Sequence, residues 1–261
     1  MYSYEQIATS TKLPDYLYHY TSLDALIGGI ITIDNIKLRC SHYDYLNDPN
    51  EMHIGELFTH KILQEADIHN FSTIKKDVFI LSLSKEKDSL PMWNMYGKGG
   101  KGVMLEFRTS VMSEHFLNLE SCLYCNKRGE LVGNDIAARF NRIVNFLIEA
   151  HKPSFPPKIM SQIVGEMQLD AINCIVKSAD FKHEKEVRAV FDLKNKSSIE
   201  FYLKNNIVVP YITIELPKNS IRRIWIGPTQ DKNRTRKSLD MFLKSLGYDI
   251  DVVESEIEYR D

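Results

Sequence analysis

The sequence contains no apolar run long enough to cross a membrane, although 43% of its 261 residues are hydrophobic. It also lacks an excess of either charge, because 33 basic and 35 acidic side chains leave a formal net charge of −2. This balance argues against a generally basic nucleic-acid-binding protein, although it allows a local basic patch. The opening residues 1–5 have no signal-peptide character. We therefore expect a soluble, cytoplasmic protein with no membrane partner.

Cysteine is scarce as well, with four residues in the whole chain. Cys122 and Cys125 form one C-x-x-C pair, but no second pair and no closely spaced histidines complete a zinc-binding pattern. The sequence therefore favours ordinary reduced thiols and predicts no resident metal ion.

Glycine is used sparingly except in one short stretch, from Gly97 to Gly102. The stretch has neither the spacing of a Walker loop nor that of a dinucleotide-binding fingerprint. It also runs into a predicted strand at 103–107, whereas those two motifs lead into helices. We interpret it as a connecting loop.

The periodicity of apolar residues predicts a mixture of strands and helices. Strands are predicted at 16–20, 36–40, 78–83, 103–107, around 123–124, at 184–191, 221–226 and 250–253. Helices are predicted from 23 to the glycines at 28–29, and at 56–65, 136–150, 158–179 and 232–246. No linker is long or biased enough to mark a domain boundary. We expect a single α+β domain over residues 1–261, with a helical insertion at about 135–180.

The predicted strand at 184–191 carries two carboxylates and a guanidinium at alternate positions. Residues i and i+2 of a strand point to the same face, so Glu184, Glu186 and Arg188 should form one polar row. Such a row can bring a proton acceptor and a charge-stabilising carboxylate to one point of a cleft. The alternative interpretation is a solvated edge strand with a local ion pair.

Aromatic and histidine side chains occur at two further positions of interest. His19 stands at the end of the first predicted strand, just before Thr21 or Ser22 as the N-cap of a short helix. Polar side chains at such positions often open into clefts. Trp93 and Tyr96 are three residues apart and would share one face of a helical turn, as core anchors or as stacking surfaces.

Taken together, these segments resemble a bacterial family catalogued as a domain of unknown function, and the resemblance spans nearly the whole chain. The segments that carry it are Tyr18-His19-Tyr20-Thr21, Asn47-Asp48-Pro49 with Glu51, Ser84, Trp93-x-x-Tyr96 before Gly102, Glu184-x-Glu186-x-Arg188, Ile226-Gly227-Pro228 and Ser255-Glu256-Ile257-Glu258-Tyr259-Arg260.

The order His, aromatic, Glu is also similar to the H-Y-E signature of ADP-ribosyltransferases. The His19-Tyr20-Thr21 start is similar to that of DarT-type toxins, which modify DNA, and CmdT-type anti-phage toxins are a further comparison. The resemblance implies a split β-sheet core with NAD bound, as a substrate, in a cleft between two sheets. It implies a toxin or anti-phage effector that transfers ADP-ribose to a nucleic acid or a protein, with an antitoxin or regulatory protein as a partner.

The resemblance also implies roles for individual residues. Glu186 would stabilise the ribosyl cation, and Glu184 would orient or deprotonate the acceptor. Arg188 would bind a phosphate or pair with a glutamate. His19, beside Thr21, would position a ribose of NAD. The stacking surface would come from one of three aromatic residues, Tyr20, Trp93 and Tyr96.

Two other functions fit the same sequence. The first is a non-catalytic module of a defence system that binds a nucleotide or a partner in the same cleft. The second is a metal-dependent hydrolase, because an acidic loop offers closely spaced ligands at Asp44, Asp48, Glu51 and His53. Only the transferase is expected to release nicotinamide from NAD.

Overall fold

The computed structural model describes residues 13–65, 77–115, 119–132, 145, 172–192, 199–228 and 231–259. The predicted helix at 136–150, apart from residue 145, and the predicted helix at 158–179 as far as residue 171 lie outside the described residues. The helical insertion and the single-domain organisation therefore stay predictions.

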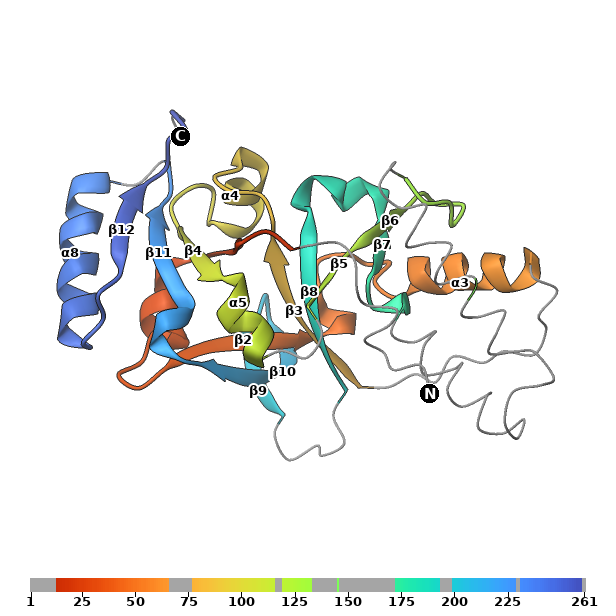
Figure 1. The fold of residues 1–261 in the computed structure, drawn as a ribbon, viewed down its shortest axis with the longest axis horizontal. Helices are drawn as coiled ribbons and strands as arrows, with labels where there is room; N and C mark the ends of the chain where they lie inside the picture. Colours follow the sequence, from red (N-terminus) through yellow and green to blue (C-terminus); the bar gives the residue numbers. More distant parts are fainter. Residues whose placement is uncertain are drawn as a thin grey trace.

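A large, mostly antiparallel sheet forms the centre of the molecule (Figure 1). Its strands are β1 (Tyr16–Thr21), β2 (Ile36–His42), β3 (Val78–Ser84), β4 (Val103–Arg108), β5 (Leu119–Ser121), β8 (Glu186–Asp192), β9 (Glu200–Lys204), β10 (Ile207–Leu216), β11 (Ile221–Ile226) and β12 (Asp251–Glu254). The main path is β12-β11-β4-β1-β3-β2-β10-β9, with β8 joined to β3 and β5 joined to β8. Strands β6 (Leu123–Cys125) and β7 (Val176–Ser178) form a separate parallel pair.

Helices and short helical turns lie around this sheet. They are α2 (Leu23–Ala25), the π-helical turn Leu26–Ile30, the 3-10 turns Tyr43–Tyr45, Ala179–Glu184 and Lys218–Ser220, and the helices α3 (His53–Glu65), α4 (Leu90–Tyr96), α5 (Thr109–His115) and α8 (Lys232–Ser245). Helix α8 packs against β11 and β12 at one end of the molecule, and α3 packs against β7 at the other (Figure 1). This mixture confirms the predicted α+β class. Within the described residues, none of these helices is both long and apolar enough to span a bilayer.

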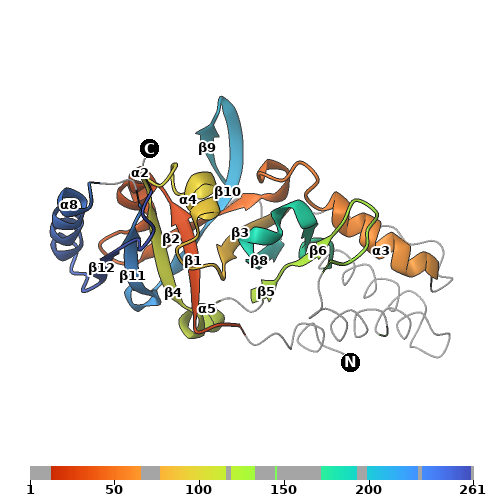
Figure 2. The ribbon, with the colours of Figure 1, turned by 90° about the horizontal axis from the view of Figure 1, so that it is seen from above.

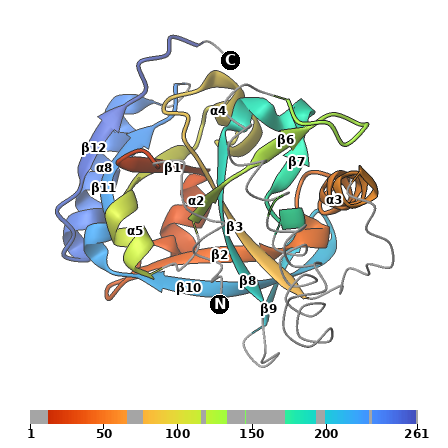
Figure 3. The ribbon, with the colours of Figure 1, turned by 45° about the vertical axis from the view of Figure 1, so that its right-hand side comes forward.

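Strand β3 is the point at which the large sheet divides, and Figure 3 shows it running beside β8. Strand β8 pairs with β3 along its whole length, from Val78 to Ser84. Strands β1 and β2 must therefore share the other edge of β3. Strand β2 pairs near one end, at Phe79 and Ile80, and β1 pairs at the opposite end, at Ser84. Residues 81–83 consequently lie where β1 and β2 have separated.

Residues 200–216, for which no strand was predicted, form the hairpin β9–β10. Lys204 pairs with Ile207, so the turn consists of two residues, Asn205 and Asn206, with φ values of 50° and 61°. Positive φ at both positions is typical of a type I′ turn, which asparagine adopts more readily than most residues. Figure 2 shows the hairpin projecting from the rest of the sheet.

Strand β4 carries a carboxylate that is buried in the core. Its residues from Val103 to Phe107 are all buried, as expected for a central strand covered on both faces. Glu106 is 2% exposed, and its carboxylate accepts hydrogen bonds from Arg222 Nη1 at 2.7 Å and Trp225 Nε1 at 2.9 Å. These partners offset the cost of burying the charge.

Candidate functional site

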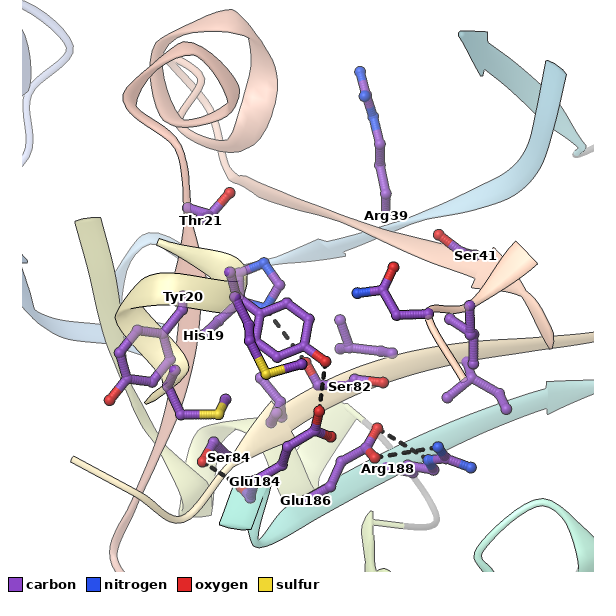
Figure 4. Close-up of a pocket in the computed structure, with 18 of the residues that line it drawn as sticks. His19, Tyr20, Thr21, Arg39, Ser41, Ser82, Ser84, Glu184, Glu186 and Arg188 are labelled. Carbon is purple, nitrogen blue, oxygen red and sulfur yellow. Dashed lines mark hydrogen bonds and ion pairs between the residues drawn. The ribbon is translucent and has the colours of Figure 1, made fainter. Parts of the chain in front are cut away.

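A cavity of about 550 Å³ opens where β1 and β2 separate over β3. This volume lies in the range of about 300–1,000 Å³ that is common for small-molecule sites. The cavity brings together most of the site residues predicted from the sequence, namely His19, Tyr20, Thr21, Tyr96, Glu184, Glu186 and Arg188 (Figure 4). The remaining residue of that set, Trp93, does not line it.

His19 reaches across the division of the sheet from β1 to β3. Its Nδ1 lies 3.3 Å from the Ser82 carbonyl oxygen (Figure 4). A carbonyl oxygen can only accept, so this contact assigns the ring proton to Nδ1 and leaves Nε2 as an acceptor. Burial lowers the pKa of His19 more than the bond to Ser82 raises it. The imidazole is therefore neutral at neutral pH and suited to accept a hydroxyl proton.

Arg188 stands at the centre of a buried cluster of charges and is fully buried. Its Nη1 and Nη2 donate to the two carboxylate oxygens of Glu51 at 2.6 and 3.0 Å. Its Nε and Nη2 donate to the two oxygens of Glu186 at 3.0 and 3.1 Å. Nη1 also donates to the Cys174 carbonyl oxygen at 2.7 Å. Two bidentate contacts of this kind fix the orientation of the guanidinium.

Lys177 links the two glutamates that the sequence singled out. Its Nζ donates to Glu184 Oε2 at 2.5 Å and to Glu186 Oε2 at 2.8 Å. All three side chains are at most 6% exposed. They form the floor of the cavity, so a ligand would reach only an edge of each carboxylate.

The electrostatics of this cluster keep Glu186 ionised. Burial would raise its pKa, but Arg188 and Lys177 outweigh burial and lower the pKa from 4.5 to about 2. For Lys177, burial would lower the pKa, but the two glutamates reverse that effect and raise it. Because the folded pKa of Glu186 is depressed, its ion pairs stabilise the protein fully above about pH 4.5. That stabilisation is lost as the pH falls towards 2.

The predicted strand position of Glu184 is wrong. Residues Ala179–Glu184 form a 3-10 helix, begun by the Ser178 hydroxyl accepting from the Asp180 amide, and β8 starts only at Glu186. Lys185, between them, is in the left-handed region with φ of 42°. The carboxylates therefore meet at Lys177 through a turn and not as alternate residues of one strand.

Helix α4 brings Tyr96 to the cavity and Trp93 to the core. The Tyr96 hydroxyl donates to Glu184 Oε1 at 2.5 Å, and burial together with Glu184 raises the pKa of Tyr96, so it stays protonated. Trp93 is fully buried and meets Tyr20 edge to face, with ring centroids 5.0 Å apart. The Tyr20 hydroxyl is itself held by the Glu86 carbonyl oxygen at 2.8 Å. Of these aromatics, Tyr96 is the one directed at the charged cluster.

Asp88 holds the start of α4 in place. Its Oδ1 accepts from Trp93 Nε1 at 2.8 Å and from the Ser255 hydroxyl at 2.7 Å. Its Oδ2 accepts from the Glu256 amide at 2.8 Å. The carboxylate thus joins α4 to the segment that follows β12.

Lys177 is a site residue that the sequence analysis missed. The helix predicted at 158–179 is wrong at its end, because residues 176–178 form strand β7 and pair with β6. The β-branched pair Ile175-Val176 is the local signal for a strand, but apolar residues at helical spacing obscured it. Nothing in so short a strand marks its lysine as part of a buried cluster.

The residues proposed for a metal site have other partners in the structure. Glu51 pairs with Arg188, and Asp48 Oδ1 accepts from the Asn50 amide at 2.9 Å in a local turn. Among the described residues, no three side chains of His, Cys, Asp or Glu are grouped to hold a metal ion. Cys122 and Cys125 are free, buried thiols, and burial raises the pKa of both.

Comparison with known families identifies one partial match. A family model described as "Protein of unknown function (DUF2971)" matches residues 92–189, which run from α4 into β8. The matched segment contains Tyr96, Lys177, Glu184, Glu186 and Arg188, so most of the charged floor lies within it.

Two further comparisons, with known proteins and with solved structures, give less information about this chain. A comparison over 218 positions, which covers 80% of this chain, shows 25% identity to part of the "Probable polyketide synthase 31" of Dictyostelium discoideum. The chain spans only 8% of the length of that relative. No solved structure matches.

Proposed function

We propose that the cavity binds NAD and transfers ADP-ribose to a macromolecular acceptor, either a nucleic acid or a protein. The observation that carries this proposal is the convergence of a neutral His19, a protonated Tyr96 and an ionised Glu186 on one cavity, with the Glu184 carboxylate beside them. The division of the sheet at β3, with the cavity inside it, supports the same proposal. So does the resemblance of the motifs to those of ADP-ribosyltransferases.

The charges of the floor suit the reaction. Cleaving the bond between the ribose C1′ and nicotinamide leaves the bonding electrons on nicotinamide and an oxocarbenium-like cation on the ribose. Glu184, Glu186 and Lys177 of the floor, together with the Arg188–Glu51 pair beside them, sum to one net negative charge when all five groups are ionised. Burial raises the pKa of Glu51, so this net charge requires Glu51 to stay deprotonated beside Arg188. A preorganised negative charge stabilises the developing cation more than it stabilises neutral ribose.

Individual residues divide the remaining tasks. Glu186, ionised at neutral pH, stabilises the cation electrostatically. Glu184 accepts the proton that the acceptor loses when its nucleophile attacks C1′. His19 accepts a hydrogen bond from a ribose hydroxyl through Nε2. Tyr96 provides a ring beside the nicotinamide end and keeps Glu184 oriented through its hydroxyl.

The protein is expected to release nicotinamide from NAD and to label a macromolecule. Purified protein would be incubated with NAD carrying a label on its adenosine half, together with mixed nucleic acids or with proteins. Nicotinamide would be measured by chromatography, and the labelled product would be tested for nuclease or protease sensitivity. No nicotinamide release with any acceptor would contradict the proposal.

His19→Ala and Trp93→Ala are expected to affect different properties, NAD affinity in the first variant and stability in the second. Truncating the buried Trp93 should cost about 3–5 kcal/mol of unfolding free energy. His19→Ala should change stability little but weaken NAD binding, because His19 is partly exposed and lines the cavity. Thermal unfolding and NAD affinity would be measured for both variants. Equally large stability losses would place His19 among the core residues and remove its proposed role.

A non-catalytic binding module is the second candidate, and one observation favours it. Glu186 is 3% exposed and its oxygens already bind both Arg188 and Lys177. A carboxylate so occupied can serve as a structural support for a nucleotide or partner site. Binding of NAD without any turnover would favour this candidate.

A further inference from the structure

The mouth of the cavity differs in charge from its floor. Arg39 on β2 and Lys204 at the end of β9 both line the cavity, and both are exposed. Figure 4 shows Arg39 well apart from Glu184 and Glu186. The cavity therefore has a cationic region separated from its carboxylates.

Arg39 is held by aromatic rings and not by a carboxylate in the described part of the chain. Its guanidinium carbon lies 4.9 Å from the centre of the Tyr211 ring and 5.3 Å from that of Tyr202. A position over two ring faces leaves in-plane N–H groups of the guanidinium as donors, and one of these is used by the Tyr211 hydroxyl. Such a planar fork matches two oxygens of a phosphate.

Lys204 is connected to the same region through a neutral side chain. Its Nζ donates to Asn47 Oδ1 at 3.0 Å, and Asn47 also lines the cavity. Within the described residues, the partner of Lys204 is an amide, which does not compensate the ammonium charge. Lys204 and Arg39 thus present two positive charges to any ligand that enters.

We propose that Arg39 and Lys204 form a phosphate subsite that binds the diphosphate of a nucleotide. The proposal rests on the proposed function for the orientation of the ligand, with its nicotinamide ribose directed at the carboxylates of the floor. Arg39 binds the diphosphate through its fork of N–H donors, and Lys204 adds a second charge. The hairpin β9–β10 contributes both Lys204 and the tyrosines that orient Arg39.

The test uses ADP-ribose, which keeps the diphosphate but has no nicotinamide to lose. Its affinity would be measured by calorimetry for the wild type, Arg39→Gln, Arg39→Lys and the control Lys37→Gln. Lys37 lies on the same strand, does not line the cavity, and pairs with Glu215 at 3.1 Å. Arg39→Gln should weaken ADP-ribose binding by a factor on the order of 10 or more. Arg39→Lys should keep an affinity between that of Arg39→Gln and that of the wild type. Lys37→Gln should bind as the wild type does.

Adenosine serves as the matched ligand without phosphate, and unfolding curves confirm that each variant is folded. An equal loss of adenosine and ADP-ribose affinity in Arg39→Gln would overturn the subsite, as would unchanged ADP-ribose binding or no binding of ADP-ribose to the wild type. If ADP-ribose binding depends on Arg39 while NAD is never cleaved, the subsite stands and the transferase proposal fails. If NAD is cleaved with an unchanged KM in Arg39→Gln, the subsite fails and the transferase stands.

Discussion

Glu186→Gln is expected to lower NAD turnover by a factor on the order of 10² or more, the effect seen when one preorganised electrostatic group is removed from an active site. The amide has nearly the same shape but lacks the charge that would stabilise the ribosyl cation. Nicotinamide release per folded molecule is the measurement. If the protein acts as a toxin, the same variant should also relieve any growth arrest caused by expressing the wild type.

The structure requires a control for stability, because Glu186 also balances Arg188 and Lys177. Glu106→Gln is a suitable one: Glu106 is equally buried, pairs with an arginine, and does not line the cavity. It should lose stability while keeping its turnover. Full turnover in Glu186→Gln, or equal losses of turnover in both variants, would contradict the catalytic role of Glu186.

Arg188→Met is expected to cost about 3–5 kcal/mol of unfolding free energy. Methionine fills a similar volume but leaves the Glu51 carboxylate buried without its bidentate partner, and leaves Glu186 with Lys177 alone. Burying an uncompensated charge is far more costly than losing a pair in which water can replace the partner. Chemical denaturation measures the loss.

Arg222→Met is the matched comparison, because Arg222 pairs with the buried Glu106 while its own side chain is 32% exposed. Water can reach the vacated position, so Arg222→Met should lose clearly less unfolding free energy than Arg188→Met. The double variant Arg188→Met with Glu51→Gln should recover part of the stability, because it removes the unpaired charge. Equal losses in the two arginine variants, with no recovery in the double variant, would show that the cluster stabilises no more than a partly exposed pair.

Helices and strands with a distinct residue pattern and distinct terminal signals could be predicted closely from the sequence. Strand β11 was predicted at 221–226 and occupies Ile221–Ile226, and α8 was predicted at 232–246 and occupies Lys232–Ser245. The three isoleucines and Trp225 of β11 favour a strand, and Gly227-Pro228 marks the turn that ends it. The Asp231 side chain, which accepts from the Arg234 amide, marks the start of the helix.

The set of residues that lines the cavity could be predicted only in part. His19 and Glu186 were found because each stands in a distinctive local pattern. Lys177 was missed, because its importance comes from parallel pairing of β7 with a strand about 50 residues earlier, and local periodicity contains no trace of that contact. Glu184 was found for the wrong reason, since a left-handed residue at Lys185 replaced the expected strand geometry. Residues at positive φ other than glycine are rare, so pattern reasoning does not anticipate them.

The three hydrogen bonds of Asp88 have a practical consequence for anyone who alters the end of the chain. Ser255 and Glu256 act as a latch on Asp88, which precedes α4 and holds Trp93 of that helix, and Tyr96 is the last residue of the same helix. A truncation before Ser255 would leave every side chain of the cavity in the sequence, yet it would release the helix that aims Tyr96 at Glu184. Proteins made for assay or labelling should therefore keep residues 255 and 256. A change in ligand affinity after C-terminal trimming would report on this latch and not on the cavity floor.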